Sequence, residues 1–193
     1  MGMTSDEDLF RAWRQGRGEA LEILVGRYHA PLLAHLARLM GDAHLGEDLI
    51  RETFLRLVRD AHSYQYPRPF RPWLYAIARH LASNYYHSAY NRREETAATP
   101  PESVSGEPEP AAWLDRWEQR DELQAALKVL SFEHREVLSL RYKQELSVEE
   151  VASIVGVPAG TVKSRTFTAL HCLRALLQSG DRADDMEGDR IRG

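Results

Sequence analysis

The sequence predicts an all-α protein in which a flexible acidic linker joins two small helical domains, the second of them containing a helix-turn-helix. Apolar residues recur at helical spacing on both sides of the middle of the chain. Residues 94–111 are instead rich in Pro, Glu, Ser and Thr and offer almost nothing to bury. Residues 145–177 have the spacing of two helices around a tight turn. We therefore expect domains at residues 1–93 and 112–178, the linker at 94–111 and a polar tail at 179–193.

The helix-turn-helix prediction depends on several constrained positions. Ser147 can cap the first helix, and Glu149 and Glu150 follow in its opening turn, where the helix dipole favours acidic groups. Gly156 suits a left-handed helix end, and Pro158 suits the start of a second helix. The second helix would bury one stripe, made of Val162, Leu170, Leu173, Leu176 and Leu177. The alternative is a helical hairpin whose basic face is only solvated.

The outward face of the second helix carries small, hydroxyl and basic side chains. Small residues let a helix N-terminus approach a phosphate, hydroxyls donate hydrogen bonds and basic groups supply charge. In the usual docking geometry these first residues meet base edges in the major groove of DNA. The candidate contacts are Ala159, Gly160, Thr161, Lys163, Ser164 and Arg165. A phosphate-binding loop is excluded because the segment has no Gly-Lys-Ser/Thr run.

The net charge of -4 is distributed unevenly along the chain. Lys and Arg against Asp and Glu number 13 to 12 in residues 1–95 and 7 to 5 in residues 123–177. Lys and Arg against Asp and Glu number 2 to 7 in residues 96–122 and 3 to 5 in residues 178–193. The net charges of the four segments, in the order given, are +1, +2, -5 and -2, which sum to -4. Both predicted domains are thus slightly basic, and the acid is concentrated between and after them. Such weak basicity predicts a modest affinity for DNA and a second binding partner.

Several classes of protein are disfavoured by composition. No apolar run approaches the length of a membrane span, and the first ten residues do not resemble a signal peptide, so we expect a cytoplasmic protein. The single cysteine, Cys172, excludes an internal disulfide and fits a buried apolar position better than a redox sensor. His80 and His87 have no acidic or cysteine partner nearby in the sequence, so we expect no metal and no cofactor.

The first domain begins with three predicted helices, at residues 6–15, 20–39 and 45–58. Asp42 is placed to cap the third, which buries Leu45, Leu49, Phe54, Leu57 and Val58. Its other face is charged, with Glu47, Asp48, Arg51, Glu52 and Arg56. That face can be either a solvated surface or a docking surface.

Residues 62–73 are rich in Pro, Arg and aromatic residues, and Pro72 suits the first position of the helix that follows. Aromatic rings can stack on unpaired bases while Arg pairs with phosphates. Trp73 fits the core, whereas Tyr64, Tyr66, Tyr86 and Tyr90 are too many for one small core and favour nucleic acid. In the second domain, Ser131 is placed to cap a helix that packs under the helix-turn-helix.

Three stretches resemble the extracytoplasmic-function group of bacterial RNA polymerase sigma factors. Residues 46–57 read GEDLIRETFLRL and are similar to the polymerase-binding segment of region 2. Residues 70–93 read FRPWLYAIARHLASNYYHSAYNRR and resemble the segment that melts DNA and reads the minus-10 element. Residues 130–165 read LSFEHREVLSLRYKQELSVEEVASIVGVPAGTVKSR and resemble region 4. The order and spacing match, and the region 3 domain of housekeeping sigma factors is missing.

The resemblance implies partners and contact residues. Core RNA polymerase would be bound through a coiled coil of one large subunit, by Asp48, Leu49, Arg51, Glu52 and Arg56. A loop at residues 64–71 would capture a flipped base, and the minus-10 contacts would be Tyr64, Tyr66, Arg68, Phe70, Arg71, Arg79, His80, Asn84, Tyr86, His87, Arg92 and Arg93. The minus-35 contacts would be Ala159, Gly160, Thr161, Lys163, Ser164, Arg165 and Thr168, although the family usually has a basic residue at this last position. The resemblance also implies an anti-sigma factor as a partner and a linker that threads the polymerase cleft.

Two other functions fit the sequence less well than this one. A stand-alone helix-turn-helix regulator would use residues 1–93 for sensing or dimerisation, but it does not require the aromatic and basic helix after Pro72. An enzyme acting on nucleic acid would need an acidic or metal-binding cluster that the sequence does not supply.

Overall fold

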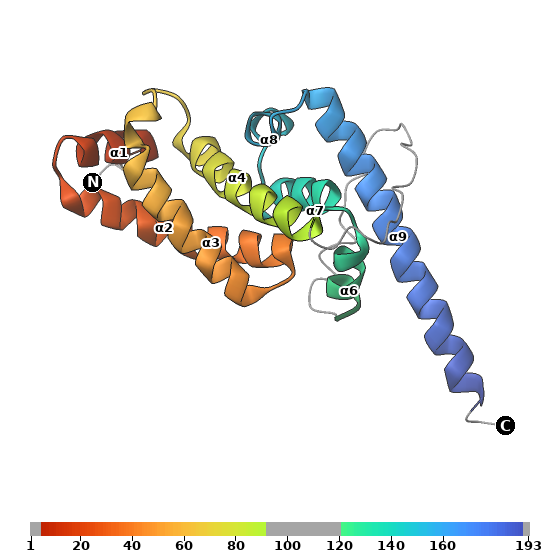
Figure 1. Cartoon of the computed structure of the whole chain (residues 1–193). Helices are drawn as coiled ribbons and strands as arrows, with labels where there is room; N and C mark the ends of the chain where they lie inside the picture. The colour runs from red at the N-terminus through yellow and green to blue at the C-terminus, as the bar shows by residue number, and fades with distance from the viewer. Residues whose placement is uncertain (1–4, 92–120, 191–193) are drawn as a thin grey trace. The chain divides into compact units, whose positions relative to one another are not determined.

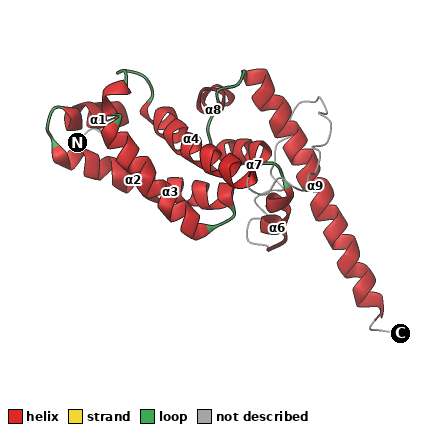
Figure 2. Cartoon of the chain, viewed as in Figure 1, coloured by secondary structure: helices red, strands yellow, loops and turns green. Residues whose placement is uncertain are grey.

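A computed structural model describes residues 5–91 and 121–190, in which every regular element is helical and no strand occurs (Figure 2). The prediction of an all-α fold is therefore confirmed. The helices form two compact units, one containing α1 to α4 with residues 149–157 and the other containing α6, α7, η2 and α9. The predicted linker at 94–111 lies outside the described residues.

The first unit consists of α1 (Asp6–Arg14), α2 (Gly18–Met40), α3 (Ala43–Arg59), the short 3₁₀ helix η1 (Ala61–Ser63) and α4 (Phe70–Asn91). Helix α2 packs against α1, α3 and α4, and α3 also packs against α4 (Figure 1). Gly41 ends α2 with a left-handed φ of 70°, and the Asp42 carboxylate caps α3 by accepting from the N–H groups of His44 and Leu45. These boundaries agree with the sequence prediction.

Helices α2 and α3 approach closely at Gly46. A methyl group built at this position would lie 2.9 Å from the Cα and the backbone nitrogen of Ala37. The absence of a side chain therefore lets the two helices pack at this distance.

Aromatic rings fill the core where α1, the segment before α4 and the start of α4 meet. The Phe10 ring is fully buried, with centroid distances of 5.0 Å to Tyr64 and to Phe70 and 5.3 Å to Trp73. The Phe70 ring also lies 5.6 Å from that of Tyr28 on α2. Tilted and edge-on ring pairs of this kind add roughly 0.5–1.5 kcal/mol each beyond the area that they bury.

The second unit consists of α6 (Asp121–Val129), α7 (Phe132–Leu138), the π-helical segment η2 (Ser139–Lys143) and α9 (Ala159–Arg190). Ser131 caps α7 by accepting from the N–H of His134, as predicted. One apolar cluster joins α6, α7 and α9, made of Leu123, Ala126, Leu127, Leu130, Leu138, Ala169, Leu170, Leu173 and Leu177. Helix α8 (Val148–Val155) precedes α9, and its buried residues are Val151, Ile154 and Val155.

Two helix bounds differ from the prediction. Helix α4 begins at Phe70, two residues before Pro72, because the Glu7 carboxylate of α1 accepts a hydrogen bond from the Phe70 N–H. Proline is tolerated in the first turn of a helix, where no N–H partner is needed. Helix α9 continues to Arg190, past the predicted domain end at residue 178, and no proline interrupts residues 178–190.

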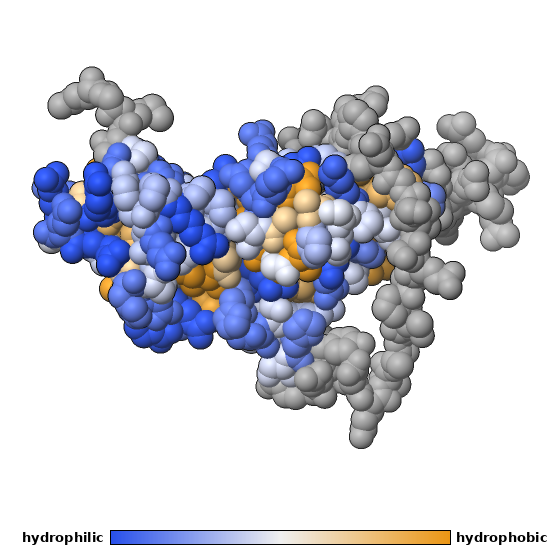
Figure 3. Space-filling view, turned by 90° about the horizontal axis from the view of Figure 1, so that it is seen from above, coloured by the Kyte–Doolittle hydropathy of each residue, from blue (hydrophilic) through white to orange (hydrophobic). Residues whose placement is uncertain are grey.

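In the described part of the chain, large apolar side chains are exposed on several elements, and two of them, Leu55 and Val58, lie one turn apart on α3. A space-filling view of one face is mostly hydrophilic, with smaller hydrophobic areas between (Figure 3). The large apolar side chains that are exposed are Ile23, Leu55, Val58, Tyr66, Tyr85 and Val129.

Candidate nucleic-acid interface

The segment from Tyr64 to Pro69 connects η1 to α4, and its conformation is fixed at both ends. The Tyr64 ring is buried among aromatic residues, and its hydroxyl donates to the carbonyl of Arg68. Burial, together with the nearby Glu7 carboxylate, raises the pKa of Tyr64 to about 12, so this hydroxyl stays protonated and can donate. We refer to residues 64–69 as the connecting loop.

Four polar or charged side chains of α1 contact the connecting loop or the residue that follows it. At one end the Arg14 guanidinium donates to the Tyr64 carbonyl at 3.2 Å, and at the other Glu7 accepts from the Phe70 N–H at 2.8 Å. Between them the Tyr66 hydroxyl lies 3.3 Å from the Asp8 carboxylate, and the Arg11 guanidinium lies 4.4 Å above the Tyr66 ring.

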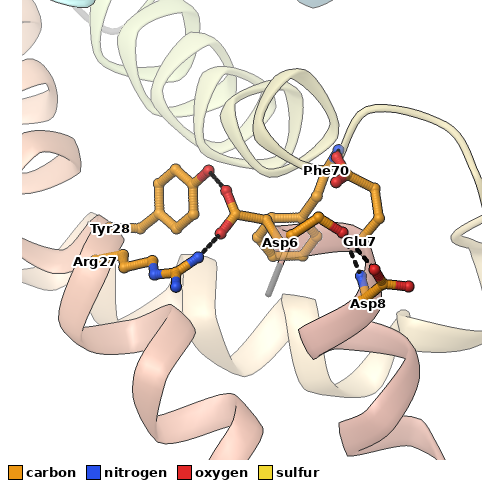
Figure 4. Close-up of polar contacts among 7 residues, drawn as sticks. Asp6, Glu7, Asp8, Arg27, Tyr28 and Phe70 are labelled. Atoms are coloured by element: carbon orange, nitrogen blue, oxygen red, sulfur yellow. Dashed lines mark hydrogen bonds and ion pairs between the residues drawn. The ribbon is translucent and has the colours of Figure 1, made fainter. Parts of the chain in front are cut away.

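Helix α1 is in turn attached to α2. One oxygen of Asp6 accepts from the Arg27 guanidinium at 2.6 Å, and the other accepts from the Tyr28 hydroxyl (Figure 4). Figure 4 also shows the neighbouring Glu7 reaching to the Phe70 nitrogen. The three acidic residues that begin α1 thus form hydrogen bonds with different residues. Asp8 also forms hydrogen bonds with Ser5, which caps the helix.

A cavity of about 260 Å³ lies between α1 and the connecting loop. Its lining consists of Arg11, Arg14, Gln15, Tyr64 and Tyr66. The two guanidinium groups and the amide offer hydrogen-bond donors, and the exposed Tyr66 offers an aromatic ring, which are the groups that bind nucleotides.

The predicted contacts on α4 lie along its exposed length. His80, Asn84 and His87 are exposed, and Arg71, Arg79 and Tyr86 are partly exposed. The Asn84 amide lies 3.0 Å from a ring nitrogen of His80, so these two side chains form one polar site a helical turn apart. Of the other predicted minus-10 contacts, Arg68 is exposed, and Arg92 and Arg93 lie outside the described residues.

The turn before α9 has the predicted geometry. Gly156 adopts a left-handed φ of 73°, and the Pro158 carbonyl accepts from the N–H groups of Thr161 and Val162. Gly160 and Lys163 are exposed and Ser164 donates to the Thr161 carbonyl at 3.1 Å, while Ala159, Thr161, Ser164 and Arg165 are partly exposed. The predicted buried stripe is confirmed for Val162, Leu170, Leu173 and Leu177.

The charged face of α3 contains ion pairs and exposed apolar groups. Arg51 contacts Asp48 at 2.8 Å, and Arg56 lies 3.6 Å from Glu52. Exposed pairs of this kind contribute little to stability. Leu55 is 66% exposed and Val58 47% exposed on the same helix. The prediction missed Leu55 and assigned Val58 to the core; helical spacing offered a signal, because residues 48, 52 and 55 share one face.

Four predicted contact residues are buried, and this corrects the sequence-based assignment. Tyr64 and Phe70 belong to the aromatic core, where they shape the connecting loop from within. Leu49 is 6% exposed and faces the interior of the first unit, since it lies on the same side of α3 as Ile50 and Thr53. Thr168 is 5% exposed beside the buried Ala169, so it is not available on the surface of α9.

No group of three or more His, Cys, Asp or Glu side chains in the described ranges is arranged to hold a metal ion. In the same part of the chain, no helix combines the length and apolar character that crossing a membrane would need.

Comparison with known proteins identifies both units. The family model for sigma-70 region 2 matches residues 24–92, and that for sigma-70 region 4 matches residues 126–175. The chain is similar to the ECF RNA polymerase sigma factor SigL of Mycobacterium tuberculosis, with 34% identity over 82% of this chain and 89% of the relative. It is also similar to the RNA polymerase sigma factor CarQ of Myxococcus xanthus, with 31% identity over 86% of this chain and 93% of the relative.

Solved structures show the same relationship. The sigma factor RpoE of Bartonella quintana, solved with the anti-sigma factor NepR, superposes with a TM-score of 0.61 at 25% identity, covering 82% of this chain and 96% of that one. The fold also matches that of CnrH, solved with the cytosolic domain of CnrY, with a TM-score of 0.66 at 24% identity over 91% of this chain and 99% of the other. A stand-alone regulator is not favoured, because the similarity extends over the first unit as well as the second. The chain belongs to the extracytoplasmic-function group of the sigma-70 family and is an RNA polymerase sigma factor.

Proposed function

We propose that this sigma factor binds core RNA polymerase through the exposed face of α3, formed by Asp48, Arg51, Glu52, Leu55, Arg56 and Val58. The observation that carries the proposal is the exposure of Leu55 and Val58 among charged side chains on a helix whose opposite side is buried. Apolar groups at the centre of a charged surface are typical of protein interfaces.

Promoter recognition is divided between the units in this proposal. The minus-10 element is read by the connecting loop and by the exposed side chains of α4, from Tyr66 and Arg68 to Asn84, Tyr86 and His87. Bases that leave the duplex are held by binding alone, so the chain acts as an initiation factor in the cytoplasm and catalyses no covalent step. The minus-35 element is read by the start of α9, with Lys163 and Arg165 as the cationic contacts.

An anti-sigma factor is a further proposed partner. It is supported by the structurally similar RpoE, which was solved in a complex with one. Such a partner would compete with polymerase for the surfaces described above.

The test is run-off transcription with core RNA polymerase on genomic DNA of the source organism, with and without the protein. We expect discrete transcripts only when the protein is present. Leu55→Asp should weaken binding to core polymerase by tenfold or more, since it places a charge at the centre of the apolar contact, while Glu22→Ala on exposed α2 surface should not. Polymerase binding that is unchanged in Leu55→Asp would contradict the docking surface.

A further inference from the structure

Helix α1 lies outside the residues that match the region 2 family model, which begin at 24. Even so, it provides the hydrogen bonds that fix both ends of the connecting loop. Resting on the proposed function, we propose that α1 determines minus-10 specificity, with Glu7 and Arg14 as positioning residues that set the loop conformation meeting an unpaired base.

Helical geometry places the α1 side chains that reach the loop on one side of this helix. Glu7, Arg11 and Arg14 are spaced by four and three residues, so they share one face of α1. Seven residues of helix correspond to about 10.5 Å along its axis. The Tyr64 carbonyl and the Phe70 N–H, which bound the connecting loop, are thus held a set distance apart by one rigid element.

Helix α1 is itself held in place by the aromatic core and by α2. Phe10 is fully buried between the Tyr64 and Phe70 rings, and Asp6 bonds to Arg27 and Tyr28 of α2. Helix α1 therefore transmits the position of α2 to the loop and is not a loosely attached terminus.

Charged side chains of α1 surround Tyr66 at the cavity. Glu7 accepts from the N–H of Phe70, the first residue of α4, and Asp8 accepts from the Tyr66 hydroxyl of the connecting loop. The guanidinium groups of Arg11 and Arg14 line the cavity beside Tyr66. Moving the loop would move the ring of Tyr66 relative to these cations and so change which base fits.

The experiment uses full-length protein bound to core polymerase and a randomised library of single-stranded DNA. Bound sequences are selected and the base preference at each position is compared between the wild type, Glu7→Ala and Arg14→Met. Glu7→Gln keeps an acceptor for the Phe70 N–H and serves as the conservative variant. Glu22→Ala and Arg17→Met remove exposed charges of the same kinds nearby and are the matched controls.

We expect Glu7→Ala and Arg14→Met to reduce the base preference by about tenfold at one or two adjacent positions, with binding to core polymerase retained. Glu7→Gln should keep most of the preference and both controls should keep all of it. Hydrogen exchange should become faster at the Phe70 amide in Glu7→Ala, which reports the lost bond directly.

Base preferences that match the wild type in both folded variants would overturn the proposal, as would a uniform loss at every position. Should Glu7→Ala fail to fold, Arg14→Met still removes the bond at the other end of the connecting loop, and an unchanged preference in that variant alone would equally count against the proposal. If the wild-type protein bound to polymerase enriches no sequence, the proposed function itself is wrong. If the wild type and the variants enrich the same sequences, the proposed function stands and only the role of α1 is wrong.

Discussion

Position 156 has a backbone φ of +73°, a region that L side chains rarely adopt, although a methyl group there would meet nothing within 4 Å. Gly160 also has free space for a methyl group but has helical backbone in α9. We expect Gly156→Ala to lower the free energy of unfolding by about 1 kcal/mol and Gly160→Ala to raise it by up to about 1 kcal/mol. Urea unfolding of the two variants measures both values; equal effects would show that backbone conformation is not the cause.

His35 is fully buried in α2, and burial together with the Arg38 charge lowers its pKa to about 3. In the unfolded chain the His35 imidazole binds a proton near pH 6.5, whereas in the folded chain it stays neutral until about pH 3. The stabilising contribution of neutral His35 is therefore complete above pH 6.5 and is lost as the pH falls toward 3. Between about pH 7 and about pH 5 we expect a loss of roughly 1–2 kcal/mol from this group. The difference in unfolding free energy between wild type and His35→Gln should shrink over this range; a constant difference would exclude His35 as its source.

Single residues were predictable where local backbone geometry requires them. Asp42, Ser131 and Gly156 cap or end helices as the sequence indicated, because each needs only its own neighbours. Tyr64 and Phe70 were assigned to DNA, although both are buried. Their burial depends on Phe10, which is distant in sequence, so local composition could not reveal it.

Packing between α2 and α3 depends on the missing side chain at Gly46. We expect Gly46→Ala to destabilise the first unit by roughly 1–3 kcal/mol, since a methyl group would lie 2.9 Å from the Ala37 backbone, which cannot move without shifting α2. Gly26→Ala, within α2 and with nothing within 4 Å, is the control and should raise stability by up to about 1 kcal/mol. Thermal unfolding followed by circular dichroism distinguishes them, and a neutral Gly46→Ala would mean that the helices can separate at no cost.

The elements themselves were largely predictable because apolar spacing and capping residues identify helices. The start of α4 was not, because its first N–H is satisfied by Glu7 from another helix. The π-helical segment at residues 139–143 is likewise not evident in the sequence. Its hydrogen bond from the Gln144 N–H to the Ser139 carbonyl spans one residue more than an α-helical bond, and the apolar pattern does not distinguish the two.

Promoter binding by the whole molecule should depend on the cations at the start of α9. We expect Lys163→Ala and Arg165→Ala each to weaken transcription from a selected promoter by roughly tenfold and to lower the salt dependence of DNA binding by about one counterion, with polymerase binding unchanged. Lys128→Ala, an exposed cation on α6, is the control. Loss of polymerase binding in the α9 variants would show that these residues contact protein rather than DNA.

At this scale the sequence resemblance identified the family and its two regions, which the comparisons confirm. The surfaces were less predictable. Leu49 was included because the resemblance places it in the polymerase-binding segment, and Leu55 of the same segment was not named, although Leu49 is buried and Leu55 is exposed. Helix α3 packs against α2 and α4 with Leu49 on its buried side and Leu55 on its exposed side.

The central position of Phe10 has a practical consequence. A fragment cut at residue 24, where the match to the region 2 family model begins, would lack this ring and leave those of Tyr64, Phe70 and Trp73 without their common neighbour. Exposed aromatic surface of that kind promotes aggregation, so the smallest soluble version of the first unit has to start before α1. The region 2 family model and the packed first unit thus begin at different residues in this protein.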